Sequence, residues 1–560
     1  MKLAKYLFLV ALLVVPFTLQ LQGQVLQANI GGSSAIWLEA GQGANAGLGC
    51  AWTDSNSTTN TWAADSRPAG GAKDFGKVWV TWNAAGGTCA APGIASTVYA
   101  YISLDSGAGN RCVFANPQCT LNTIDVAGNA GSNALAGVTD TALPAGVLAA
   151  FNGQPITVAG SDITPMDALF ATYQALAPCG LLSSGTQFQG YGRGSWPGPG
   201  TQIQATDGTA IFNVLGWQIT GTDPFSGNPA AGAYTITPVG ATPVVVFVNT
   251  NNAGGFGNAA IQNVTRFTLG LVESNILVRT SDFIPQVYNN AGGAAVTVWH
   301  RESLSGTYNT FDRVIANSKE LYRPQEQQCP PVEPLNFSRT VGGFTSTNGR
   351  AIGTGDMVSQ TLATPDSIGY AFWSAGNFKN ALFGNVVKGA RYLTVDGVDP
   401  LCTTYGCGGN PGQIPTATNG FLANVNLNNI QNGSYPIWSE LRMVSINAAG
   451  NAVAAQIAAW AQAFVTTPGG AQPDYITAPN LNVIHAHFAP SSYGIVNDIP
   501  GVTSEGPRVC GAGGPQENGA DAGGSVHTLQ AGSDYAVLKG NYNAAGCTGI
   551  TSLASFGVHN

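Results

Sequence analysis

The segment from Arg301 to Thr307, with the sequence Arg-Glu-Ser-Leu-Ser-Gly-Thr, combines groups that bind a small anion. The guanidinium of arginine offers a planar fork of donors that fits a tetrahedral oxyanion. Ser305, Gly306 and Thr307 stand where an amphipathic helical pattern begins, and the free N–H groups and dipole of a helix start favour an anion. The alternative is an ordinary serine N-cap beside a solvated arginine, because serine and threonine are favoured caps anywhere.

Asp162 is the second candidate. It precedes Thr164 and Pro165, which suit the N-cap and the first position of a helix. An ionised carboxylate only accepts hydrogen bonds, so it can accept from an oxyanion that carries a proton and repels one that carries none. The alternative for Asp162 is a local Asx turn. A third element, the small-residue turn Gly32–Ala35, can present backbone N–H groups.

The elements that must position these residues alternate between strand and helix patterns. Short apolar or alternating runs predict strands, and apolar residues at helical spacing predict helices after 164, over 308–322 and over 453–464. This alternation predicts an α/β protein with mainly parallel or mixed sheets, in which ligands bind beyond the carboxyl ends of strands. Segments 39–76 and 105–111 are rich in small and polar residues, and we interpret them as a loop and a turn. The strands are expected at 78–82, 98–104, 156–158, 243–248, 295–299, 365–373 and 435–445.

The N-terminal segment and the cysteines predict an exported protein. Lys2 and Lys5 precede an apolar run that is too short to span a bilayer, so residues 1–28 are expected to be a signal peptide cleaved before Asn29, and no membrane span is expected in the mature chain. The ten cysteines form an even set, as expected of disulfides in an exported chain. The pairs favoured by sequence are Cys112–Cys119 and Cys402–Cys407, then Cys50–Cys89 and Cys510–Cys547.

Charge and motifs exclude several function classes. With 21 basic and 29 acidic residues, the net charge of −8 gives no electrostatic footprint for nucleic acid. The sequence has no Cys-x-x-Cys pair, nucleophile elbow or P-loop, so we expect neither an enzyme nor a metal or cofactor site.

These residues together resemble a family, the phosphate-type substrate-binding proteins of bacterial ABC importers. The motifs that carry the resemblance keep their order along the chain: Gly32–Ala35, Ser161-Asp162, Pro243–Val248, Arg301–Phe311, Ser367–Tyr370 and Tyr435–Ile437. The resemblance implies a two-lobed class II periplasmic-binding-protein fold that closes around its ligand. It places lobe one at 29–249 plus 435–560 and lobe two at 250–434.

The resemblance also implies a site, partners and a compartment. A small oxyanion, phosphate first, would be bound by Arg301, Ser305, Gly306 and Thr307 from one lobe, and by Asp162, Ser34, Ala35, Ile36 and Ser106 from the other. The protein would be a periplasmic or extracellular monomer that serves an ABC permease.

This chain departs from the family pattern in ways that leave alternatives open. Ala35 replaces a hydroxyl residue, and Ser303 replaces the acidic residue two positions after the arginine. The stretches 39–76, 180–235 and 500–530 read as insertions. The alternatives are therefore a binding fold reused for extracellular attachment, or a secreted phosphate-ester hydrolase.

Overall fold

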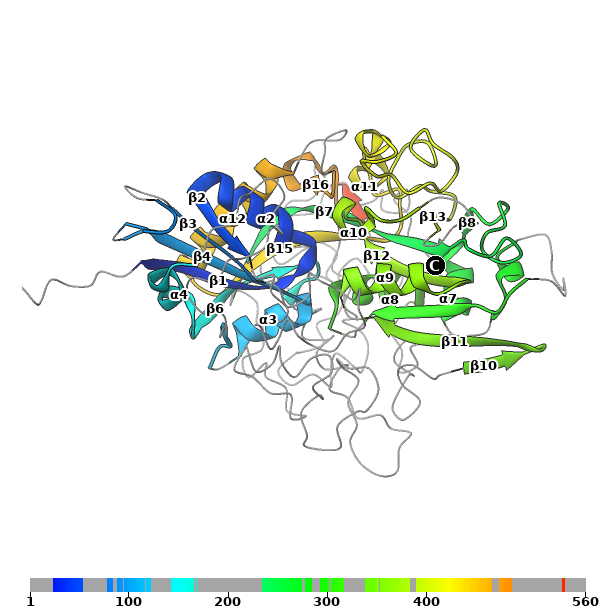
Figure 1. Ribbon diagram of the computed structural model, residues 1–560, viewed down its shortest axis with the longest axis horizontal. Coiled ribbons are helices and arrows are strands. Elements are labelled where there is room, and N and C mark those ends of the chain that lie inside the picture. The colour runs from blue at the N-terminus through cyan, green and yellow to red at the C-terminus, as the bar shows by residue number, and fades with distance from the viewer. Residues whose placement is uncertain are drawn as a thin grey trace, which may run out of the picture.

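The computed structural model of the 560-residue chain is shown in Figure 1. The residues that it describes are 24–53, 78–83, 88–121 except 94 and 116, 143–165 with 168, 234–316 except 274–276, 285–292 and 302–303, 338–382 except 352, 389–465, 473–485 and 536–538. Among these residues no helix is both long and apolar enough to cross a membrane.

A mixed 14-stranded sheet runs through the molecule. Its main path has the order β10-β11-β9-β12-β7-β15-β6-β1-β4-β3-β2. The strands of this path are β1 Val25–Ser33, β2 Gly49–Thr53, β3 Val78–Asn83, β4 Thr97–Leu104, β6 Gln154–Ser161, β7 Thr235–Asn249, β9 Thr297–Arg301, β10 Ser338–Val341, β11 Phe344–Ala351, β12 Ser367–Phe372 and β15 Trp438–Ser445. Three short strands also pair with strands of this sheet: β5 Thr120–Leu121, β13 Ala390–Tyr392 and β16 Ile476–Thr477. Two small sheets are separate from it. One pairs β8 Asn263–Val264 with β14 Thr394–Val395, and the other pairs β17 Val483–His485 with β18 Ala536–Leu538.

The sheet has two halves that share β7. The first half contains β2, β3, β4, β1, β6 and β15, and the second contains β12, β9, β11 and β10; Figure 1 shows them side by side. Strands β1, β4 and β6 pair in parallel in the first half, as do β9, β11 and β12 in the second. The long strand β7 pairs antiparallel with β12 on one side and with β15 on the other. The predicted α/β class with a mixed sheet is confirmed.

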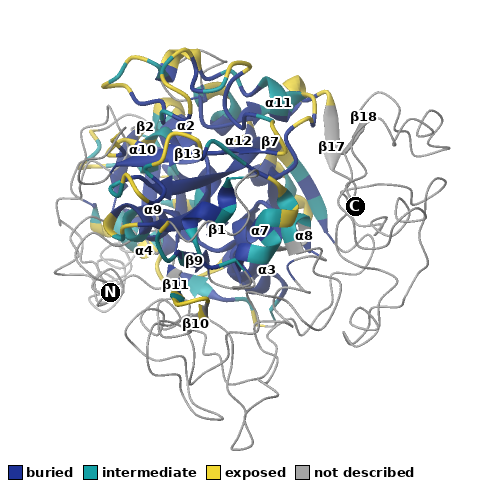
Figure 2. Cartoon of the chain, turned by 90° about the vertical axis from the view of Figure 1, so that its right-hand side faces the viewer, coloured by how far each residue is buried: buried dark blue, intermediate teal, exposed yellow. Residues whose placement is uncertain are grey.

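Helices cover the sheet halves. The remaining elements are α2 Ser34–Leu48, α3 Ser106–Phe114, α4 Ala145–Phe151, α7 Arg266–Glu273, α8 Gly306–Ala316, α9 Thr354–Ala363, α10 Ala375–Phe378, α11 Asn428–Gln431, α12 Ala448–Phe464 and the 3₁₀ turns Thr280–Phe283, Leu422–Asn424 and Ala478–Asn480. Side chains of a strand point alternately to its two faces. In β4, Val98, Ala100 and Ile102 accordingly join the core under α3 and α4, while Tyr99 and Tyr101 join the core under α2 and α12. Figure 2 shows how completely the central strands are buried.

Two segments that the sequence indicates as loop and turn are helices. Residues 39–48 belong to α2, residues 49–53 form β2, and residues 106–111 belong to α3, so the sequence interpretation was wrong there. Their Gly, Asn and Ser residues lower the helix propensity, but tertiary packing supplies most helical stability in proteins. Every residue of α3 is buried. Small residues in α2 let it approach α12 closely, since a Cβ on Gly43 would collide with the backbone of Trp460.

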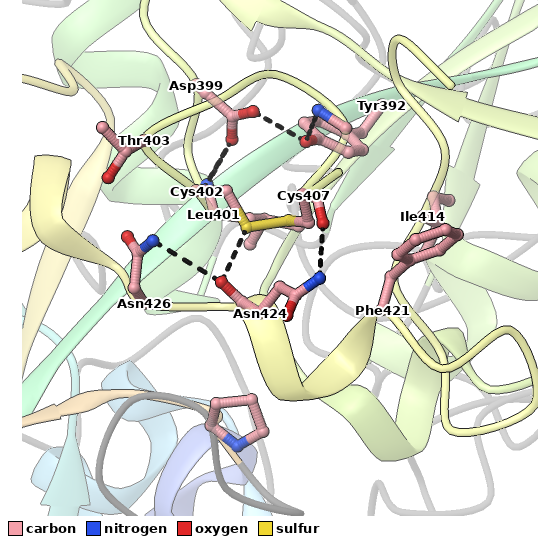
Figure 3. Close-up of a disulfide and its surroundings, with 12 residues drawn as sticks. Tyr392, Asp399, Leu401, Cys402, Thr403, Cys407, Ile414, Phe421, Asn424 and Asn426 are labelled. Atoms are coloured by element: carbon pink, nitrogen blue, oxygen red, sulfur yellow. Dashed lines mark hydrogen bonds between the residues drawn. A yellow bond between two sulfur atoms is a disulfide. The ribbon is translucent and has the colours of Figure 1, made fainter. Parts of the chain in front are cut away.

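Three disulfides lie among the described residues, and all three were predicted. They are Cys50–Cys89, Cys112–Cys119 and Cys402–Cys407; the predicted pair Cys510–Cys547 lies outside the described residues. Figure 3 shows the last of the three. Asp399 lies beside it and accepts hydrogen bonds from Tyr392 Oη and Leu401 N, both at 2.7 Å. The disulfide and the buried carboxylate of Asp399 therefore order this loop, whose Leu401 joins the core of the second half.

Candidate functional site

Arg301 is the last residue of β9, and its side chain is 2% exposed. Its backbone N–H donates to Tyr370 Oη of β12 at 3.2 Å, and Nη1 donates to Thr354 Oγ1 at the start of α9 at 3.1 Å. Nη2 lies 3.5 Å from Asp105 Oδ1, which comes from the first half of the sheet. Two contacts, one from each half, therefore orient the guanidinium at the junction, while Tyr370 holds the backbone of Arg301.

The predicted helix start at 305–307 exists, because α8 begins at Gly306. Ser305 Oγ accepts from Tyr308 N at 3.2 Å, which is the interaction of an N-cap. Thr307 Oγ1 donates to Asp162 Oδ2 at 3.5 Å, so the same turn also faces the second candidate. A Cβ on Gly306 would collide with Asp162 Oδ1, and only glycine allows this approach. The turn before α8 therefore lies directly against Asp162.

Asp162 follows β6 and is 3% exposed. Its backbone N–H donates to Ser106 Oγ at 3.0 Å, so Ser106, which the resemblance also implied as a ligand residue, lies beside Asp162. Burial raises the pKa of Asp162 from 3.8 to about 6, against the opposing effects of a backbone hydrogen bond, the charges of Arg301 and Arg442, and the hydroxyl of Ser33. Oδ1 is buried and accepts no hydrogen bond from the described residues. The carboxyl group is therefore poised to exchange or share a proton near neutral pH.

The N-terminal turn Gly32–Ala35 meets the site through Ser33, which belongs to the predicted turn but was not among the individually predicted ligand residues. Ser33 is the N-cap of α2 and contacts Asp162, and its Oγ already accepts from Ala35 N at 3.2 Å. The side chains of Ala35 and Ile36 lie in the core shared with α12, and Ser34 is half-buried in the first helical turn. Ser33 is thus the residue of this turn whose hydroxyl reaches Asp162, and oxyanion binding by Ser34, Ala35 and Ile36 stays a prediction.

Charged residues in apolar strands are the second group that sequence reasoning missed. Arg442 Nη2 pairs with Glu440 Oε2 at 2.8 Å within β15, and both side chains are nearly inaccessible. Asp105 directly follows the apolar strand β4. A signal was present, because a charge inside or at the end of a fully apolar run is rarely buried without a partner. Ser303 lies outside the described residues.

The assembled site contains donors and acceptors of opposite charge from both halves. The first half contributes Asp105, Ser106, Asp162 and Ser33, together with Arg442 and Glu440 of β15. The second half contributes Arg301, Thr307 and Thr354. Such a set can hold a small anion that carries a proton: guanidinium and hydroxyl groups donate, and a carboxylate accepts. Among the described residues no three His, Cys, Asp or Glu side chains are grouped to hold a metal ion.

Comparisons with known proteins found matches only among solved structures. No protein-family model matches the chain, and no curated protein is similar enough to match. Three solved structures illustrate the matches found: PstS from Borrelia burgdorferi (12% identity, TM-score 0.29, 78% of this chain and 92% of that one), the periplasmic phosphate-binding protein PfluDING bound with phosphate (13%, 0.30, 79% and 91%), and an ABC-type phosphate transport receptor from Vibrio cholerae (12%, 0.25, 43% and 70%). TM-scores this low do not support an inference from these structures to this chain, so the fold is assigned from the chain's own strand order.

Proposed function

We propose that this protein is a receptor for a small protonated oxyanion, with phosphate as the first candidate, bound between two lobes. The observation that carries the proposal is the convergence of Asp162 with Arg301 and Thr307, which lie far apart in sequence and on opposite halves of the sheet. The lobes are the two predicted ones, 29–249 plus 435–560 and 250–434. Strand β7, which pairs with β12 of the second half and with β15 of the first, would form the hinge.

The charge balance of the site supports a protonated ligand. Arg301 and Thr307 supply hydrogen-bond donors. The ionised carboxylate of Asp162 has no proton to donate, so it acts only as an acceptor. A ligand such as hydrogen phosphate offers the proton that this carboxylate needs, whereas sulfate near neutral pH offers none. Selection between two anions of similar size then follows from one acceptor, without any difference in pocket shape.

We further propose export and delivery to an ABC permease by a monomer. The three disulfides are consistent with an oxidising compartment. The cleavage site predicted before Asn29 falls within β1, whose Val25 N–H donates to Ser96 O at 2.9 Å. We therefore place signal cleavage upstream of Val25, and N-terminal sequencing of the exported protein tests this placement.

Calorimetry with phosphate, arsenate and sulfate tests the proposed ligand. We expect heat of binding with phosphate and arsenate and none with sulfate. Arg301→Ala should weaken phosphate binding at least about 100-fold, because it leaves buried acceptors without their donor. The matched control is Arg266→Ala, which removes an arginine paired with Asp396 on the outer part of the second half.

The outcomes separate the proposal from its alternatives. If no oxyanion gives heat of binding, the receptor proposal fails and extracellular attachment becomes the better explanation. If a generic phosphate ester is cleaved, and Asp162→Ala abolishes the cleavage, the protein is a hydrolase instead.

A further inference from the structure

The first turn of α3 lies directly on the turn between β9 and α8, across the junction of the two halves. Gly107 N–H donates to Leu304 O at 2.9 Å, which is a backbone hydrogen bond between the halves. A Cβ on Gly107 would lie 2.8 Å from the same oxygen, a separation that real Cβ atoms do not show. Residue 107 is therefore suited to this close approach because it is glycine.

Asp105 occupies the N-cap position of α3 but does not cap it. An aspartate at this position ordinarily accepts from the second or third N–H of its helix. The Asp105 side chain makes no such bond, and its Oδ1 instead lies 3.5 Å from Nη2 of Arg301, a residue 196 positions away in the other half. Both side chains are 2% exposed. A favourable local interaction has been exchanged for one across the junction.

The position of this ion pair gives it a conformational consequence. Thr354 orients Arg301 within its own half, whereas Asp105 contacts it from the opposite half, so this contact would be lost if the halves moved apart. When the halves part, both charges regain water, so the pair contributes to the free energy of closure and not to the stability of either half. Removing one partner of a buried ion pair strongly destabilises the arrangement that buries it, because the remaining charge stays desolvated and unpaired.

We propose that Asp105 is a positioning residue that orients Arg301 from the opposite half and keeps a closed arrangement populated before any ligand binds. Its effect on ligand affinity rests on the function proposed above, whereas its effect on closure does not. Removing the carboxylate lowers the closed population, and the apparent affinity then falls by the same factor. Simple charge repulsion makes the opposite forecast: an anion should bind more tightly once a neighbouring carboxylate is gone.

Hydrogen exchange in phosphate-free buffer tests closure directly. The Gly107 amide, bonded to Leu304 O, should be protected in the wild type without ligand and should exchange at least about 10-fold faster in Asp105→Asn. The Gly153 amide, bonded to Leu121 O within the first half, should be unchanged. Asp396→Asn is the matched control, because it removes a carboxylate paired with an arginine inside the second half. Equal protection of Gly107 in the wild type and Asp105→Asn overturns the proposal.

A double-mutant cycle and a titration complete the test. Asp105→Asn and Arg301→Gln should each speed exchange at Gly107, and the double variant should speed it no further than either single one; additive effects would show that the two residues act separately. Phosphate should bind Asp105→Asn about 10-fold more weakly, with Asp105→Glu between it and the wild type, and tighter binding would refute the positioning role. If phosphate binds neither protein, the receptor function fails while the exchange result still decides closure.

Discussion

Replacing Asp162 by asparagine should make the ligand-free protein more stable at neutral pH. The pKa of this carboxyl group is raised to about 6 by burial, so the folded state binds protons more tightly than the unfolded state does. Between about pH 4 and 6 the folded state therefore holds more protons, and the free energy of unfolding falls as the pH rises through this window. The shift of about two pKa units corresponds to about 3 kcal/mol at pH 7.5.

The neutral amide removes this penalty but introduces N–H donors of its own. An unsatisfied buried donor costs about 1 kcal/mol or more, so the expected net gain of Asp162→Asn is about 2 kcal/mol at pH 7.5. At pH 4 the wild-type carboxyl is largely protonated in the folded state, and the two proteins should differ by less than about 1 kcal/mol. The gain should come with a loss of oxyanion affinity, because an amide at this position no longer offers two acceptor oxygens.

Urea unfolding in phosphate-free buffer at pH 4 and pH 7.5 measures both quantities. The decisive value is the change in the difference between the variant and the wild type from one pH to the other. Asp396→Asn is the control, because its carboxylate is partly exposed and ion-paired. If Asp162→Asn is no more stable than the wild type at pH 7.5, or if the difference is the same at both pH values, then burial does not raise the pKa of Asp162 as reasoned.

Three further predictions concern packing, a buried acid pair and a disulfide. Gly306→Ala should lower oxyanion affinity at least about 10-fold in calorimetry, because the new methyl group collides with the site carboxylate, and wild-type affinity would contradict this packing. Burial, and then the charge of Asp474, raise the pKa of Glu39, so Glu39→Gln should flatten the fall in thermal stability between pH 5 and 8; an unchanged slope would rule out this origin. The double substitution Cys402→Ser with Cys407→Ser should lower the free energy of unfolding by about 2 kcal/mol, as a short closed loop predicts, and a Tm equal to that of the wild type would show that the hydrogen bonds of the loop suffice.

The strands with long apolar runs were predictable because their signal is local, whereas β1, β2, β10 and β11 were not predicted. The run from Pro243 to Val248 is apolar without interruption, and such a run suits only a strand covered on both faces. The positions of Arg301 at a strand end and of Thr307 at a helix start could be predicted for the same reason, because the patterns that mark these boundaries span only a few residues. Their proximity to Asp162 came from the resemblance to a family and not from spacing, and the structure brings these residues together.

The parts that could not be predicted depend on distant partners. Residues 39–48 and 106–111 have the composition of loops, and they are helical because α12 and the sheet bury them. The sequence around Asp105 indicates a turn, and its contact with Arg301 at 3.5 Å could not be predicted because the two residues are far apart in the sequence. Ser33 reaches Asp162 because it stands where β1 ends and α2 begins, and such a boundary is uncertain by one or two residues when it is inferred from sequence.

The order of strands in the sheet also constrains how the chain can be made. The side of β6 that does not pair with β1 is filled by β15, whose first residue follows the last residue of β6 by 277 positions, Ser161 to Trp438. Until β15 is available, a nascent or translocating chain presents a long apolar strand edge, the kind of surface that recruits other chains. We therefore expect a chain that stops before Trp438 to aggregate instead of yielding a folded half, so the first half cannot be studied as an N-terminal fragment.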